Sequence, residues 1–260
     1  MKFTYHIPVQ QYGFLEISGE GYEELADATE KYNDYAEVKI NRTPYISPTF
    51  RKVTTFTGEE ILYDADKHYY TDLEGNHLVS GSEYKKSLES PFDIDTIAPK
   101  TAKSKGISEH DLRDMWKRNG NISTGFGTAL HQVMEQWFKH RKNGTDKNYH
   151  LPKHPFLKSA IETFPLKDAE GHPELFVSDV KNKRVGQIDL LVVTGEKEGY
   201  IVDYKTDAEV KKNVEGHFNQ LSFYAHILIA KGWSIPKVEV WNYTDSWTSY
   251  ESPVLDIITK

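Results

Sequence analysis

Cysteine is absent from this chain of 260 residues. Without a thiol, the protein has no means of forming a disulfide, a catalytic thiolate, an iron–sulfur cluster or a zinc site built from thiolates. Oxygen atoms, with imidazole nitrogen beside them, are therefore the ligands that a bound metal would find. This absence favours a hard divalent cation over the metals that prefer sulfur.

Long hydrophobic runs are missing as well. No stretch approaches the roughly 20 consecutive apolar residues that a membrane-spanning helix needs. The first residues, MKFTYHIPVQQYGF, lack the charged and then apolar order of a signal peptide. These patterns predict a cytoplasmic protein with no membrane partner. The apolar fraction of 38% and the length suit one large globular domain, or a domain with a smaller one attached.

Positive charge is scarce overall, because the formal net charge is −7. Such a balance argues against a nucleic-acid partner, since phosphate binding needs Lys and Arg. The acidic excess is confined to residues 1–76, which hold 7 Lys/Arg against 14 Asp/Glu. Residues 98–147 carry 10 Lys/Arg against 5 Asp/Glu. A basic segment is thus available for a nucleic-acid backbone, although a solvated helix face explains such an excess equally well.

The first 50 residues have a composition of their own. Residues 14–20 predict a strand, and residues 21–38 predict an acidic helix with apolar positions at helical spacing. Residues 41–52 contain two prolines and are typical of a linker. We therefore expect a small acidic α+β extension over 1–50 and one larger domain over 51–260. The extension can serve as a binding site for a protein partner or restrict entry to a substrate groove.

The larger domain shows alternating strand and helix patterns. Residues 59–85 have alternating aromatic positions around Glu74-Gly75-Asn76, which predicts a β-hairpin. An aspartate three residues after Ser108 resembles a capping box, so we expect a short helix from there to Trp116 and a longer one over 124–141. Five further elements are expected: strands over 174–180, 185–193, 199–206 and 237–243, and a helix over 213–231. This order predicts an α/β core with a mixed central sheet flanked by helices.

The turn at residues 194–198 has a consequence for two aspartates. If it closes an antiparallel pair, Asp189 lies directly across from Asp203. Opposed Cβ atoms are about 4.5–5.5 Å apart, and at ~5 Å with an effective dielectric constant of about 20 the repulsion is about 3 kcal/mol. The neighbouring residues are apolar on both faces, as in an interior strand. Two carboxylates in that setting must share a proton, pair with a cation or bind a metal.

Lys205 lies two residues after Asp203 and therefore on the same side of the strand. A buried ion pair between the two is one interpretation. A metal ion is the one we favour, because two carboxylates at one point suit a hard cation whose remaining positions are filled by water and phosphate. Lys205 can then orient or deprotonate the attacking water, or stabilise charge on the phosphate.

These residues resemble a known family. Gly186-Gln187-Ile188-Asp189 and, after the turn, Ile201-Val202-Asp203-Tyr204-Lys205-Thr206 are similar to the catalytic hairpin of the PD-(D/E)xK nuclease superfamily. The RecB-like branch, with mitochondrial genome maintenance exonucleases and phage recombination nucleases, is the most similar part of it. Three further features appear in the same chain order: the glycine-then-histidine segment 127–135, Glu174, and the Gln-x-x-x-Tyr signature of Gln220 and Tyr224. The hairpin ending in residues 77–80 is also similar to the entry segment of the mitochondrial group. The resemblance covers about residues 70–245, and the iron–sulfur cysteines of some members are absent.

The resemblance implies a role for each residue of the site. His131, Asp189, Asp203 and the carbonyl of Tyr204 would hold Mg²⁺ or Mn²⁺, and Lys205 would activate the water. The strand would be positioned by Gln220, Tyr224 and Thr128. Taken alone, His131 is better interpreted as a hydrogen-bonded structural histidine. With the hairpin downstream, the interpretation as a metal ligand is favoured instead. Two residues keep alternatives: Glu135 orients His131 or is a surface charge, and Glu174 contacts a second metal or its water, or is exposed.

The sequence therefore predicts a restriction-endonuclease-like fold and a Mg²⁺- or Mn²⁺-dependent deoxyribonuclease. The resemblance implies an exonuclease that leaves 5′-phosphates, in DNA recombination, repair or replication, with a phage or mobile element as a setting. One alternative is a catalytically silent DNA-binding or assembly module with the same fold. Another is the same chemistry on RNA.

Overall fold

The computed structural model describes residues 2–9, 13–20, 51–65, 67–90, 92–145, 149–207 and 209–257. The chain divides into two compact units. Met1–Ser47, Pro91–Ala129 and Lys153–Pro155 form the first, and Pro48–Ser90, Leu130–Pro152 and Phe156–Lys260 form the second. The expected boundary near residue 50 between an extension and a nuclease domain stays a prediction.

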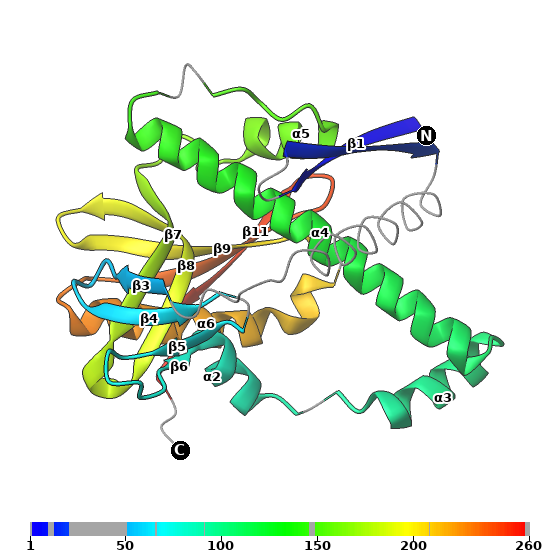
Figure 1. Cartoon of the computed structure of the whole chain (residues 1–260), viewed down its shortest axis with the longest axis horizontal. Helices are drawn as coiled ribbons and strands as arrows, with labels where there is room; N and C mark the ends of the chain where they lie inside the picture. Colours follow the sequence, from blue (N-terminus) through cyan, green and yellow to red (C-terminus); the bar gives the residue numbers. More distant parts are fainter. Residues whose placement is uncertain are drawn as a thin grey trace. The chain divides into compact units, whose positions relative to one another are not determined.

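The first unit contains a two-stranded sheet, in which β1 (Lys2–Val9) pairs antiparallel with β2 (Gly13–Glu20) (Figure 1). The predicted strand over 14–20 is thereby confirmed. The helix expected over 21–38 and most of the linker expected over 41–52 lie outside the described residues.

Two helices follow in the chain. In α3 (Ile94–Lys105), the Asp93 side chain accepts from the backbone of Thr96, and Gly106 ends the helix with a left-handed φ of 67°. In α4 (Glu109–Lys142), Ser108 Oγ accepts from the Asp111 backbone over 3.0 Å, which confirms the predicted cap. The expected break between 116 and 124 was wrong, because α4 is continuous. A glycine at position 120 lowers the stability of the helix by only about 1 kcal/mol relative to alanine. A helix that has already formed on either side extends readily through such a position.

The second unit is built on a six-stranded sheet in the order β11-β10-β9-β8-β6. β9 and β6 pair with different parts of the same edge of β8, and β7 pairs along its opposite edge. Parallel pairs join β9 to β10 and β6 to β8, and the remaining pairs are antiparallel. The strands are β6 (Val79–Ser80), β7 (Gly171–Asp179), β8 (Arg184–Gly195), β9 (Glu198–Lys205), β10 (Lys237–Tyr243) and β11 (Trp247–Pro253). The α/β core with a mixed sheet is thus confirmed, and β11 is an addition that the sequence reading missed.

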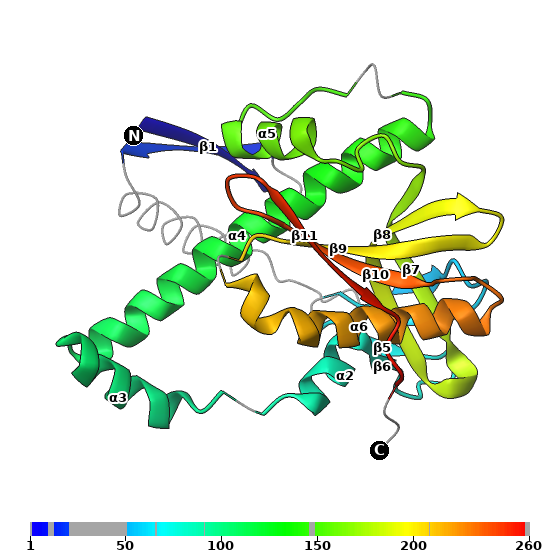
Figure 2. The same cartoon turned by 180° about the vertical axis from the view of Figure 1, so that it is seen from behind.

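One face of this sheet is covered by α6 (Val210–Ala230), with α2 (Gly81–Leu88) packed beside it (Figure 2). The core between helix and sheet includes Leu191, Ile201, Leu221, Ala225, Leu228, Val238 and Val240. Burying each large apolar side chain contributes about 1.5–3 kcal/mol. The helix expected over 213–231 is confirmed. In contrast, α2 was not expected; Ser80 and Glu83 form its capping box.

The opposite face is covered by α5 (Pro155–Thr163) and the residue that follows it. The ring of Phe164 packs against Tyr204, Trp241 and Trp247 with centroids 4.6–5.6 Å apart. Side chains alternate along a strand. Asp203, one residue before Tyr204, therefore points toward the face that α6 covers.

A three-stranded sheet joins β3 (Arg51–Thr54), β4 (Glu60–Asp64) and β5 (Tyr69–Thr71). The main turn of this sheet falls between β4 and β5, before the position expected at 74–76. At the expected position the Asp72 carboxylate accepts from the backbones of Glu74 and Asn76, and a single bridge joins Thr71 to His77. The main-chain N of Asp72 also donates to the Asn76 carbonyl, and that of Leu78 donates to the Tyr70 carbonyl. The chain therefore reverses antiparallel around the predicted position, in a short turn that follows the β4–β5 hairpin.

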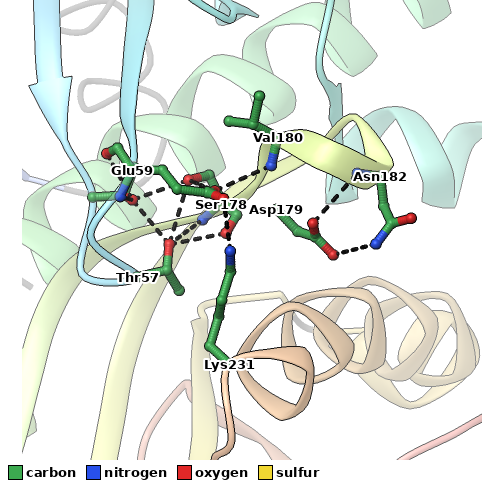
Figure 3. Close-up of polar contacts among 8 residues, drawn as sticks. Thr57, Glu59, Ser178, Asp179, Val180, Asn182 and Lys231 are labelled. Carbon is green, nitrogen blue, oxygen red and sulfur yellow. Dashed lines mark hydrogen bonds and ion pairs between the residues drawn. The ribbon is translucent and has the colours of Figure 1, made fainter.

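Glu59 ties the small sheet to the main one (Figure 3). Its carboxylate accepts from Ser178 Oγ over 2.8 Å and from the Val180 backbone over 3.1 Å, and it pairs with Lys231 Nζ at 2.6 Å. Thr57 Oγ1 donates to the Ser178 carbonyl over 2.9 Å. These bonds connect β7 and the end of α6 to the segment before β4.

Within the described residues, no helix has the length and apolar character needed to cross a membrane.

Candidate active site

The edges of β8 create an opening in the sheet. Along one edge β7 pairs from Arg184 to Val192. Along the other edge β6 pairs with Arg184 and Val185, and β9 begins to pair only at Leu190. Residues 186–189 therefore lie between the ends of two different strands. The side chain of Asp189 sits at this opening instead of inside a continuous ladder.

The predicted register of β8 and β9 is confirmed. Leu190 pairs with Val202, so the next position along brings Asp189 opposite Asp203. There the ladder ends, and the main-chain N of Tyr204 donates to Asp189 Oδ2 over 2.9 Å. The carboxylate thus takes the place of a backbone acceptor, which fixes its orientation.

A third carboxylate lies in the same row. Pro173 pairs with Leu190 and Leu175 pairs with Ile188, which places Glu174 opposite Asp189 across β7 and β8. Glu174 has a φ of 47°, and the left-handed conformation costs a residue with a Cβ roughly 1–2 kcal/mol. Gln187 Nε2 donates to Glu174 Oε2 over 2.6 Å. Burial raises the pKa of Glu174, although its hydrogen bond with His131 works in the opposite direction.

His131 reaches this row from α4. Its Nε2 lies 3.0 Å from the Tyr204 carbonyl oxygen, and because a carbonyl only accepts, Nε2 carries the hydrogen of this bond. Its Nδ1 lies 3.5 Å from Asp189 Oδ1 and 3.8 Å from Glu174 Oε1. The ligand atoms of His131, Glu174 and Asp189 all lie within 4.8 Å of one another. One imidazole and two carboxylates form a donor set that fits a divalent cation, with water and phosphate as further ligands.

The charges of the row shift the acidity of its members. Burial alone would lower the pKa of His131, but Asp189 and Glu174 raise it well above its ordinary value. Burial would raise the pKa of Asp189, and the facing His131 lowers it instead. A positive charge at this point therefore stabilises the carboxylates, whether a proton on the imidazole or a metal ion supplies it.

Asp203 and Lys205 form a buried ion pair, with Nζ 2.5 Å from Oδ2. Burial raises the pKa of Asp203 to about 6, and Lys205 limits that rise. Lys205 Nζ also donates to the Tyr204 carbonyl over 3.1 Å. Both interpretations of the hairpin thus have a counterpart here, since Asp203 has its cation partner while Asp189 belongs to the group that can hold a metal. Asp203, which was expected as a ligand, lies outside that group of side chains, and Glu174 lies inside it. The expected part of the Tyr204 carbonyl as a ligand stays a prediction.

Tyr224 fills the space left by two glycines. A Cβ at Gly186 would lie 2.1 Å from Tyr224 Cε1, and a Cβ at Gly81 would lie 2.3 Å from it. Gln220 Nε2 donates to the Tyr224 hydroxyl over 3.1 Å and to Ser82 Oγ over 3.2 Å. The glycine of the β8–β9 hairpin and the Gln-x-x-x-Tyr signature are therefore parts of one packing arrangement beside Asp189.

The remaining predicted residues lie elsewhere. Glu135 pairs with Lys139 one turn further along α4, and its expected part in orienting His131 stays a prediction. Thr128 is exposed on α4 and belongs to the first compact unit, so its expected contact with substrate also stays a prediction.

The structure brings three residues to the site that were not predicted from the sequence: Gln187, His217 and Lys85. Gln187 donates a hydrogen bond to Glu174. His217 Nδ1 lies 4.0 Å from Asp203 Oδ2 and 3.5 Å from Lys85 Nζ. Burial and the ammonium groups of Lys205 and Lys85 lower the pKa of His217 to about 3, so the ring is neutral at pH 7. His217 lies one turn before Gln220 and so on the same face of the helix, and this spacing could have identified His217 as a site residue from the sequence.

Residues 157–242 match the family model of the PD-(D/E)XK nuclease superfamily. The match runs from α5 to β10 and includes Glu174, Asp189, Asp203 and Lys205, while His131 precedes it. The mixed sheet flanked by helices is the restriction-endonuclease-like core that was predicted. No curated protein sequence matches the chain. The superfamily match indicates a metal-dependent nuclease.

Proposed function

We propose that this chain hydrolyses phosphodiester bonds in DNA with the help of a divalent cation. The observation that carries the proposal is the row of Glu174, Asp189 and Asp203 across three neighbouring strands, with His131 and Lys205 against it. Like charges opposed in a sheet destabilise it. A fold that retains such a row at an opening in the sheet is suited to binding a cation and a phosphate there.

The residues have distinct tasks in this proposal. His131, Asp189 and Glu174 hold the cation, and the Tyr204 carbonyl orients His131 through Nε2. When bound, the cation supplies Lewis acidity toward the phosphate and acidifies a water ligand. Lys205 is held in its charged form by Asp203, so we assign it to orienting water and stabilising the charge that develops on the phosphate. Gln220 and Tyr224 border the path of the strand.

The finer features of the proposal come from the resemblance to RecB-like nucleases. We infer Mg²⁺ or Mn²⁺ as the cation, DNA as the partner and 5′-phosphates at the products. Attack at a DNA end is favoured over internal cleavage, and recombination, repair or replication is the setting in which such an exonuclease acts.

The test incubates purified protein and Mg²⁺ or Mn²⁺ with end-labelled single- and double-stranded DNA and with matched RNA. Asp189→Asn and Lys205→Ala each remove one charged group of the site, and we expect each to reduce the cleavage rate by roughly 10²–10³. Lys211→Ala, an exposed lysine early in α6, is the matched control and should retain activity. If the wild-type protein releases no more nucleotide than Asp189→Asn, the proposed function is wrong.

The product pattern decides between the alternatives. DNA binding without cation-dependent cleavage would instead support the silent binding module. Faster cleavage of the RNA oligonucleotide would change the substrate class. Mononucleotides released from the first minutes indicate attack at an end, whereas shortened oligonucleotides indicate internal cleavage.

A further inference from the structure

A polar track runs between α2 and α6, two helices that lie beside each other (Figure 2). Ser82 and Lys85 are one turn apart on α2, and His217 and Gln220 are one turn apart on α6. The two pairs face each other, because Ser82 meets Gln220 at 3.2 Å and Lys85 meets His217 at 3.5 Å. Polar side chains therefore replace apolar ones along this part of the helix contact.

The inner end of the track reaches the row of carboxylates formed by Glu174, Asp189 and Asp203. His217 Nδ1 lies 4.0 Å from Asp203 Oδ2, which in turn pairs with Lys205. An ammonium group can only donate, so the Nδ1 of His217 is the acceptor of the Lys85 bond. The ammonium group of Lys85 and the carboxylate of Asp203 thus both lie within 4.0 Å of the same ring nitrogen of His217.

The outer end of the track is open. Lys85 borders a groove of about 610 Å³ at the end of α2 and the beginning of α6. Its side chain is 19% exposed, and Nζ forms an ion pair with Glu89 Oε1 at 3.8 Å, a distance too long for a hydrogen bond. A lysine ammonium has three donors, of which the bond to His217 uses one. The other polar lining residues are the donors Ser90, Lys212, Asn213 and Asn219 and the two carboxylates Glu89 and Glu215.

We propose that Lys85 binds a phosphate of the nucleic-acid backbone next to the scissile one, and that His217 is the positioning residue that holds Lys85 there. This inference rests on the proposed nuclease function. A strand whose scissile phosphate lies at the cation and Lys205 has its neighbouring phosphate one nucleotide away. The track from Asp203 through His217 to Lys85 leads from the row of carboxylates to the groove, which gives that second phosphate a cation and amide donors.

The test measures binding of a fluorescein-labelled single-stranded DNA oligonucleotide by anisotropy in EDTA, which separates binding from cleavage. We expect Lys85→Met, which keeps the apolar stem, to weaken binding and to reduce the slope of log K against log salt by about one unit. Lys85→Arg should restore most of the slope. Lys86→Met, the exposed neighbour on α2, is the matched control and should bind nearly as the wild type does.

His217→Phe tests the positioning role. It should weaken binding as Lys85→Met does, and the double variant should show little further loss, because the two changes remove one interaction. With Mg²⁺ present, Lys85→Met should raise KM and leave kcat nearly unchanged, whereas Lys205→Ala lowers kcat. A purely structural role would lower the thermal unfolding temperature without changing the salt slope.

The outcomes are distinct. If the wild type binds and cleaves DNA while Lys85→Met binds with the same affinity and slope, the inference is overturned and the nuclease proposal stands. If the folded wild type neither binds nor cleaves DNA, both fail together. If Lys85→Met fails to fold, a Lys85→Gln variant with wild-type affinity would overturn the inference in the same way.

Discussion

At the scale of single residues, the empty space beside Gly186 decides where Tyr224 lies. A Cβ there would be 2.1 Å from the tyrosine ring, far inside any real contact. The ring also lies against Gly81, and its hydroxyl accepts from Gln220. A hydrogen in place of a methyl group thus allows α6 to approach the strand that carries Asp189.

Gly186→Ala should therefore destabilise the protein. Overpacking of this kind costs about 1–3 kcal/mol, because either the strand or the Tyr224 ring must move. Urea unfolding measures the change. Gly195→Ala is the control, since its Cβ would meet Glu198 Oε2 at an ordinary 3.4 Å, and it should change stability by less than about 0.5 kcal/mol. Equal stability of Gly186→Ala and the wild type would contradict the close packing of Tyr224 against Gly186.

At the scale of elements, α4 shows that a sequence with several poor helix formers can still be one helix. Residues 117–123 include Gly120 and two asparagines, yet the helix runs from Glu109 to Lys142. Helix formation is cooperative, so flanking segments that are already helical carry a weak stretch between them. The same helix bears His131, which makes its continuity relevant to the site.

Gly120→Ala should stabilise the protein by about 0.5–1 kcal/mol, since alanine prefers the helix and a Cβ at this position meets nothing within 4 Å. Gly106→Ala is the opposite case. Its φ of 67° at the end of α3 favours glycine, so alanine should destabilise by about 1 kcal/mol. Circular dichroism during thermal unfolding compares the two. A destabilising Gly120→Ala would show that the segment is not helical in solution.

At the scale of the whole molecule, stability should depend on the cation. A ligand that binds the folded state alone, at a hundred times its Kd, stabilises it by about 2.7 kcal/mol. We expect Mn²⁺ or Mg²⁺ to raise the thermal unfolding temperature of the wild type and EDTA to reverse the increase. Glu174→Gln and Asp189→Asn should each lose this response, because both residues belong to the group that can hold a metal.

Asp203→Asn discriminates between the two ligand sets. Asp203 lies beside Lys205 and outside that group, so its variant should retain most of the shift. If Asp203→Asn abolishes the response and Glu174→Gln keeps it, the set expected from the resemblance is correct instead. Glu60→Gln, which removes an exposed ion pair with Lys52, controls for nonspecific effects of charge.

Local sequence determined much of this protein. The strands at 185–193, 199–206 and 237–243 and the helix at 213–231 followed from periodicity and turn residues. The opposition of Asp189 and Asp203 followed from the position of one turn, because pairing register depends on turn length.

Tertiary structure decided the rest. Glu174 joins the row through a left-handed φ that its side chain does not favour, and His131 receives its orientation from the carbonyl of Tyr204. Lys85 and His217 meet only because α2 and α6 pack together. The contacts of His131 with Tyr204 and of Lys85 with His217 each join segments far apart in the chain. Periodicity reports which face of an element is buried, whereas the identity of the facing residue depends on how the elements pack.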